Sequence, residues 1–119
     1  MGTKSRLRRT ISKWANPDEA EARDLRKTFS GKGVVSIDEA PDREKVTLRG
    51  SLRTVTLRPR GGVPALEAEL YDGTGVVTVI WLGRRRIAGI GPGRSIEVTG
   101  RLGRTDDSRI LYNPRYELL

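Results

Sequence analysis

The feature that most constrains this chain is an alternation of apolar and polar residues that begins at Lys45. One parity is occupied by apolar residues and glycine, namely Val46, Leu48, Gly50 and Leu52. A period of two is typical of a β-strand with one buried face. The alternation then slips by one residue, because Val55 and Leu57 continue the apolar side. Such a slip indicates a β-bulge, which lets one long strand bend and serve two faces of a small barrel.

Four further short strands follow with the same period. They are predicted at 66–71, 76–82, 95–102 and from Arg109 onward. A tight Asp-Gly turn joins the strands at 66–71 and 76–82, and a short connector precedes the strand at 95–102. Pro114 cannot donate to a strand ladder, so it marks an edge or a bend. Five short strands with this connector are typical of the OB-fold. The chain is therefore predicted to be all-β, a five-stranded OB-fold barrel with an N-terminal helical extension.

The barrel is expected to occupy residues 45–119, and residues 1–44 are expected to form an arm, a helix and a linker before it. In the arm, Leu7, Ile11 and Trp14 have helical spacing among five cations and no acid. Two interpretations stay open for the arm, a basic amphipathic helix and a disordered basic segment.

A helix start follows the arm in the sequence Asn-Pro-Asp-Glu at 16–19. Asparagine can cap a helix, proline suits its first position, and acids suit its positive end. The helix is expected from about Pro17 to about Phe29, and its sparse apolar residues suit a surface or partner-binding helix. The residues from Val34 to Asp42 are expected to be a linker that leans on the barrel.

The charge of the chain points to a polyanionic partner. The 23 Lys and Arg residues exceed the 15 Asp and Glu residues, which gives a net charge of +8. Residues 45–119 hold 13 basic and 7 acidic side chains, and 12 of the 13 are arginine. Excess positive charge on a small domain is typical of nucleic-acid binding. A solvated surface whose charge serves solubility is the alternative interpretation.

The composition also excludes several kinds of chemistry. The chain has no Cys and no His, which removes disulfides, thiol nucleophiles, Cys-containing zinc sites and His-based acid–base catalysis. We therefore predict no enzyme activity, no cofactor and no metal. No apolar run approaches the roughly 20 residues of a membrane span. These features predict a cytoplasmic protein that has no membrane partner.

Several strings in the sequence resemble the OB-fold superfamily that includes the wedge domain of RecG-type helicases. They are VTLRGSLRTV at 46–55, ELYDGTGVVTVIWLG at 69–83, IGPGRSIEVTGRLGR at 90–104 and ILYNPRYELL at 110–119. The whole chain is also similar to small stand-alone bacterial OB-fold proteins, which share its basic start and acidic helix. The resemblance implies a nucleic-acid-binding module. It implies no helicase activity, because the chain has no motor segments.

An OB-fold binds its ligand on the outer face of its second and third strands, between the first–second and fourth–fifth loops. Arginines at these loops can bind phosphates as bidentate forks, and an outward tyrosine can stack on a base. The candidate residues for nucleic-acid binding are Arg49, Arg53, Arg58, Arg60, Tyr71, Arg101, Arg104 and Arg109. The expected ligand is DNA or RNA, with a single strand favoured and little sequence specificity.

Other residues near this face weigh on the prediction. Glu67 and Glu69 share the parity of Tyr71, so they would repel phosphate. They favour an alternative function, a protein-interaction adaptor that docks to a larger complex. Trp81 shares the parity of the apolar residues before it, which favours a core position over a stacking role. The cluster Arg84-Arg85-Arg86 could extend a phosphate track, contact a partner or remain solvated.

Overall fold

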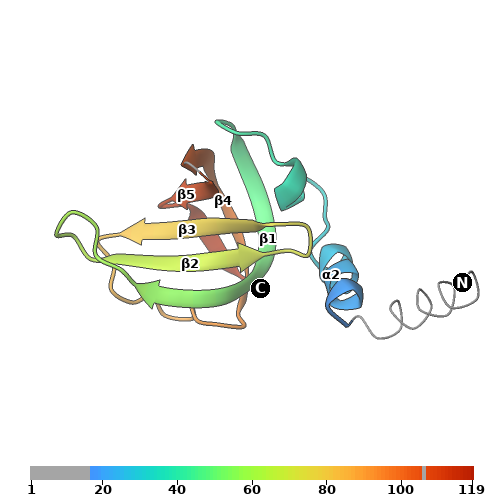
Figure 1. Cartoon of the computed structure of the whole chain (residues 1–119), viewed down its shortest axis with the longest axis horizontal. Coiled ribbons are helices and arrows are strands. Elements are labelled where there is room, and N and C mark those ends of the chain that lie inside the picture. Colours follow the sequence, from blue (N-terminus) through green and yellow to red (C-terminus); the bar gives the residue numbers. More distant parts are fainter. Residues whose placement is uncertain (1–16, 106) are drawn as a thin grey trace, which may run out of the picture.

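A computed structural model of the chain describes residues 17–105 and 107–119 (Figure 1). The basic arm at 1–15 and Asn16 lie outside the described residues. The described elements are α2 (Pro17–Thr28), the 3-10 turn η1 (Ile37–Glu39), β1 (Lys45–Leu57), β2 (Ala65–Tyr71), β3 (Val76–Leu82), β4 (Ser95–Thr105), β5 (Ser108–Tyr112) and β6 (Arg115–Leu118). The helix therefore begins at the predicted proline and ends one residue before the predicted end.

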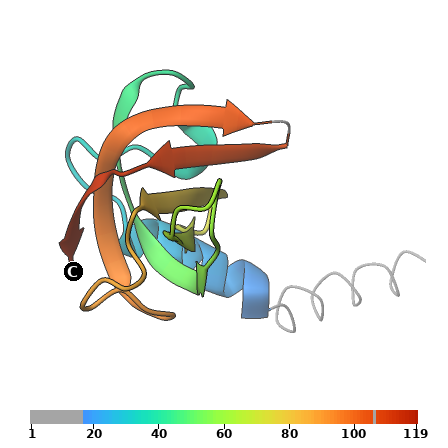
Figure 2. The same ribbon diagram turned by 90° about the vertical axis from the view of Figure 1, so that its left-hand side faces the viewer.

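Five strands form a closed sheet. β1 pairs antiparallel with β2 and also with β4, β3 pairs antiparallel with β2 and parallel with β5, and β5 pairs antiparallel with β4. The order β1-β2-β3-β5-β4 thus returns to β1. Figure 2 shows the strands around the central core, with β4 curving across one side. This connectivity confirms the predicted all-β OB-fold with an N-terminal helical extension.

β1 serves both sides of the closed sheet because it bends near its middle. Its N-terminal half pairs with β4 and its C-terminal half with β2. In the pairing with β2, Leu52 lies opposite Leu70 but Thr54 lies opposite Glu69, so Arg53 is the extra residue of a bulge. A Cβ at Gly50 would lie 2.7 Å from the backbone oxygen of Tyr71. The predicted slip is confirmed, and the strands cross so closely at the bend that only glycine fits.

The inward residues of the alternating strands form the core. Its fully buried side chains include Leu48, Leu52, Leu70, Val79, Ile96, Val98, Leu102 and Leu111. Trp81 is 4% exposed, so the predicted core position is confirmed. Its indole Nε1–H donates to the Pro114 carbonyl at 3.3 Å, and its ring meets the Tyr116 ring edge to face at a centroid distance of 5.7 Å. These contacts satisfy the polar edge of the buried indole.

The end of the chain differs from the prediction, because the expected fifth strand is divided in two. Asn113 adopts a positive φ of 48° between β5 and β6, and its backbone N–H donates to Ile80. Pro114 follows it and has no N–H to continue the β5 ladder. β6 therefore leaves β5 and pairs with the N-terminal half of β4 instead.

The segment before β1 is packed into the barrel. Ile37 is 1% exposed and Ala40 is 4% exposed, and both belong to the main core cluster. The buried carboxylate of Asp72, in the β2–β3 turn, accepts the Ile37 backbone N–H at 2.9 Å. Its other oxygen accepts the backbone N–H groups of Thr74 at 2.8 Å and Gly75 at 3.2 Å, and the Thr74 hydroxyl at 2.7 Å. The same carboxylate thus shapes the turn and holds the preceding segment against it.

Replacing Asp72 by alanine should destabilise the fold strongly. The variant leaves three backbone N–H groups without their acceptor, and we expect a loss of about 3 kcal/mol in the free energy of unfolding. Urea denaturation followed by tryptophan fluorescence measures this loss. Asp38→Ala is the matched control, because Asp38 is an exposed acid on the segment that packs against the same turn. Equal stability of the two variants would contradict the assigned role of Asp72.

Candidate nucleic-acid interface

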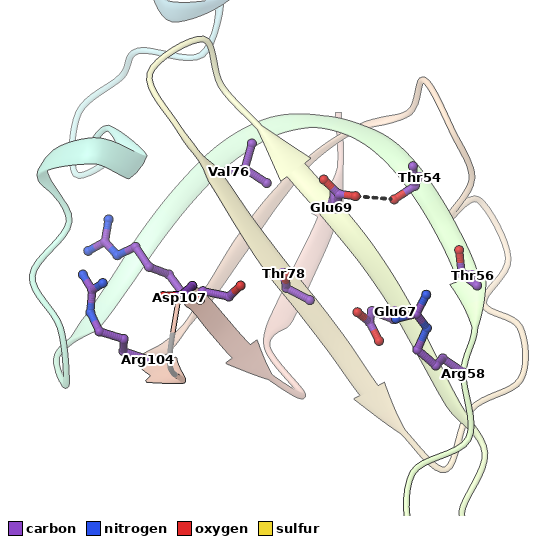
Figure 3. A pocket seen from close by; sticks show the side chains of 11 residues that line it. Thr54, Thr56, Arg58, Glu67, Glu69, Val76, Thr78, Arg104 and Asp107 are labelled. Carbon is purple, nitrogen blue, oxygen red and sulfur yellow. Dashed lines mark hydrogen bonds between the residues drawn. The ribbon is translucent and has the colours of Figure 1, made fainter.

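An open groove crosses the outer face of β2 and β3, where an OB-fold is expected to bind (Figure 3). Its volume is about 640 Å³. One wall comes from the C-terminal half of β1, the floor from β2 and β3, and the other wall from the β4–β5 loop. The lining residues are Thr54, Thr56, Arg58, Glu67, Glu69, Val76, Thr78, Arg104, Asp107, Ser108 and Arg109. None of the described residues before β1 lines the groove, so α2 and η1 leave this face open.

The two walls of the groove carry cations that face each other across the sheet. Figure 3 shows Arg58 at one side and Arg104 at the other, with β2 and β3 between them. The side chain of Arg58 makes no hydrogen bond or ion pair with any residue that the structure describes. A guanidinium without such partners can donate two parallel hydrogen bonds to a phosphate.

The floor of the groove is acidic, as the parity of the sequence predicted. Glu67 forms an ion pair with Arg60 at 3.1 Å, and Glu69 accepts a hydrogen bond from the Thr54 hydroxyl at 3.2 Å. With Asp107 in the β4–β5 wall, the groove is lined by three carboxylates and three guanidiniums. Its charge is therefore balanced, and the net positive charge of the protein lies elsewhere.

The cations of the β4–β5 wall are anchored to the segment before β1. Arg104 donates to Asp42 at 2.9 Å, and Arg109 reaches the same carboxylate at 3.3 Å. Arg109 also donates to the backbone oxygens of Ile37 and Ala40. Because its side chain is only 15% exposed, Arg109 acts mainly as a clamp on η1. Arg104 is 53% exposed and keeps part of its fork open to the groove.

The remaining predicted residues lie outside the groove. The Arg53 guanidinium stacks 4.7 Å from the centre of the Tyr71 ring, and both residues line a second hollow of about 370 Å³ beside Leu25 of α2. This cation–π contact occupies one face of the ring that was expected to stack on bases. Arg49 forms an ion pair with Glu97 of β4 at 2.8 Å, and Arg101 is exposed on β4.

The structure thus brings three of the eight predicted residues together in the groove: Arg58, Arg104 and Arg109. Arg60 reaches its edge through Glu67. Sequence reasoning missed Asp42, which is 62 residues from Arg104, because no local pattern links the two. It also missed the hydroxyl groups of Thr54, Thr56 and Thr78 in the groove. Their outward parity was visible in the strand alternation and could have indicated them.

The chain is similar to known proteins in its structure, whereas its sequence matches no known family. No family model and no curated protein sequence matches the chain. Among solved structures, the p204 HINb domain is similar with a TM-score of 0.60 and 17% identity, covering 74% of this chain and 48% of that one. RecG bound to a three-way DNA junction has a TM-score of 0.58 and 21% identity, with 82% and 14% covered. A replication protein A heterotrimer bound to ssDNA has a TM-score of 0.51 and 17% identity, with 76% and 68% covered.

These similarities support the fold that the strand pairing defines, an OB-fold. The chain spans about half of the HINb structure and a seventh of RecG. Across residues 17–105 and 107–119, no helix is long and apolar enough to cross a membrane. The same residues hold no cluster of three or more acidic, histidine or cysteine side chains that could bind a metal ion.

The ion pairs of Asp42 with Arg104 and Arg109 should lower the pKa of its carboxyl group. The hydrogen bond from Arg104, supported by Arg109, holds the pKa of the Asp42 carboxyl below its ordinary value of 3.8. Since the folded-state pKa is lowered, the pair contributes stability at neutral pH and loses it as the pH falls through that lowered pKa. Arg104→Gln should return the pKa of Asp42 towards 3.8. An NMR pH titration of the Asp42 carboxyl carbon measures it.

Arg101→Gln provides the control for this titration, since it removes the same charge from the same strand without a contact to Asp42. An Asp42 pKa that moves equally in both variants would show that the general field of the protein, not the hydrogen bond, sets its value.

Proposed function

We propose that this chain is a non-catalytic nucleic-acid-binding module with low sequence specificity that favours single strands. The observation that carries the proposal is the open groove on the β2–β3 face. On one wall the Arg58 guanidinium has no partner among the described residues, and on the opposite wall Arg104 is 53% exposed. A nucleic-acid strand that crosses β2 and β3 would place phosphates at both walls of the groove. The net charge of +8 favours the approach of such a polyanion.

The fold supports the same proposal. RecG is bound to a three-way DNA junction and replication protein A to ssDNA in the structures that this chain resembles. The groove offers guanidinium forks and threonine hydroxyls, which are groups that contact phosphates without reading the base sequence. No aromatic side chain of residues 17–105 or 107–119 lines it. Affinity would therefore come mainly from phosphate contacts and would fall steeply with salt.

A salt titration tests this function directly. Fluorescence anisotropy with a labelled oligothymidylate should show binding at low salt that weakens linearly in log K against log salt. Arg58→Ala should reduce the slope by about 0.7, the value for one phosphate contact of a single strand. Arg115→Ala is the control, because Arg115 is exposed on β6 and lies outside the groove. The absence of binding by the unmodified protein at low salt would refute the proposal.

The acidic floor provides a second and more local test. If the strand lies in the groove, Glu67 and Glu69 repel it, so Glu67→Gln with Glu69→Gln should tighten binding several-fold. The control pair is Glu44→Gln with Glu117→Gln, which changes the net charge equally at exposed positions outside the groove. Electrophoretic or anisotropy titration compares the two pairs. Equal tightening by both pairs would mean that only net charge matters and would remove the ligand from this groove.

A protein-interaction adaptor is the second candidate, and the edge strand β6 favours it. Among the described strands β6 pairs only with β4, so one side of its backbone is open to a further strand. Tyr116 and Leu118 on this strand are 38% and 39% exposed. Partners recovered with the protein should survive nuclease treatment under this function, whereas loss of all partners on nuclease treatment would argue against it.

A further inference from the structure

Two loops lie together at the end of the barrel that is remote from α2 (Figures 1 and 2). The first joins β1 to β2, and the second begins the connection from β3 to β4. The Gly83 N–H donates to the Pro64 carbonyl at 2.7 Å, and β3 ends in register with the start of β2, with Leu82 opposite Ala65. We call this surface, residues 57–64 and 82–86, the distal rim.

The distal rim concentrates positive charge without any acidic residue of its own. Its five arginines are Arg58, Arg60, Arg84, Arg85 and Arg86. The last three are exposed and form no hydrogen bond or ion pair with the described residues. Within the described part of the chain, Arg60 is the one rim arginine with an acidic partner, Glu67 on the adjacent strand. The rim therefore differs from the groove, where carboxylates and guanidiniums balance.

The rim also exposes apolar side chains between these cations. Leu57 is 49% exposed, Val63 is 44% exposed and Leu82 is 40% exposed. Leu57 ends β1 and Leu82 ends β3, so both stand where the strands run into the rim loops. Alternating cationic and apolar groups match a nucleic-acid strand, which presents phosphates beside the flat apolar faces of its bases. A surface that served solubility alone would gain nothing from exposed leucine and valine.

Arg58 belongs to both surfaces, since it lines the groove and begins the β1–β2 loop. We propose that a nucleic-acid strand leaves the groove at Arg58 and continues over the distal rim, where Arg84, Arg85 and Arg86 bind its phosphates. This inference rests on the proposed function and extends it by giving the nucleic-acid strand a path beyond the groove. The rim, where Arg84, Arg85 and Arg86 have no acidic partner among the described residues, supplies more of the electrostatic attraction than the groove does.

The path predicts a dependence on the length of the ligand. A short oligothymidylate of about 5 nucleotides fills the groove alone, whereas one of about 15 reaches the rim as well, within the range of OB-fold sites. Arg84→Ala with Arg85→Ala and Arg86→Ala should leave the affinity for the short oligonucleotide nearly unchanged. It should weaken the long one at least tenfold at low salt and reduce its salt slope by about 2, for three lost contacts.

Two further variants make the test specific. Arg23→Ala with Arg26→Ala and Lys27→Ala removes three positive charges from α2 at the other end of the protein. Arg84→Lys with Arg85→Lys and Arg86→Lys keeps the charge of the rim and should retain most of the salt slope. Thermal unfolding of each variant checks that the barrel stays intact.

The outcomes separate this inference from the proposed function. If the unmodified protein binds neither oligonucleotide, the proposed function itself fails. If it binds both but the rim and α2 triple variants lose equal affinity for the long one, only net charge acts and the path over the rim is overturned. Rim-dependent binding to phosphatidylserine vesicles with unchanged oligonucleotide binding would also overturn it and assign the rim to a lipid surface.

Discussion

The double pairing of β1 is the constraint on which the rest of the structure depends. One strand of 13 residues pairs with β4 through its first half and with β2 through its second. The bulge at Arg53 and the absence of a side chain at Gly50 make the bend between the halves possible. Without this bend the sheet would remain open, and the outer face of β2 and β3 would not lie between the β1–β2 and β4–β5 loops. The groove is therefore a consequence of how one strand turns.

The distribution of charge follows from the packing around that groove. On the β4–β5 wall, the carboxylate of Asp42 forms ion pairs with Arg104 and Arg109. The carbonyl oxygens of Ile37 and Ala40 accept further hydrogen bonds from Arg109. On the floor, the two glutamates face the arginines and threonines of β1 and its loop. The charges that have partners near the groove stabilise local structure, whereas Arg84, Arg85 and Arg86 of the distal rim have no acidic partner among the described residues and remain available to a ligand. The overall charge of +8 is thus a poor guide to where a polyanion would be attracted most strongly.

Much of the fold could be predicted from the sequence because strand parity is a local property. Parity indicated the core position of Trp81, the outward glutamates and the slip that became the bulge at Arg53. The candidate site was less predictable, because parity assigns a side chain to a face and says nothing about its neighbour on a distant strand. Arg109 points towards the expected region, yet its partners are carbonyl oxygens about 70 residues away in the chain. Tyr71 faces outward, yet the bulge that displaces Arg53 brings a guanidinium over its ring.

The burial of Ile37 and Ala40 has a consequence for the smallest unit that can fold by itself. A fragment begun at Lys45 would contain every strand, but it would lose two core side chains and open the apolar surface beneath them to water. The buried carboxylate of Asp72 would lose one of its donors, and the guanidinium of Arg109 would lose three acceptors, the carbonyl oxygens of Ile37 and Ala40 and the carboxylate of Asp42. The segment from Val35 to Asp42 is therefore part of the packing of the barrel, and the N–H of Val35 already donates to Thr47 of β1. A graft of this barrel into another protein must carry that short non-strand segment with it.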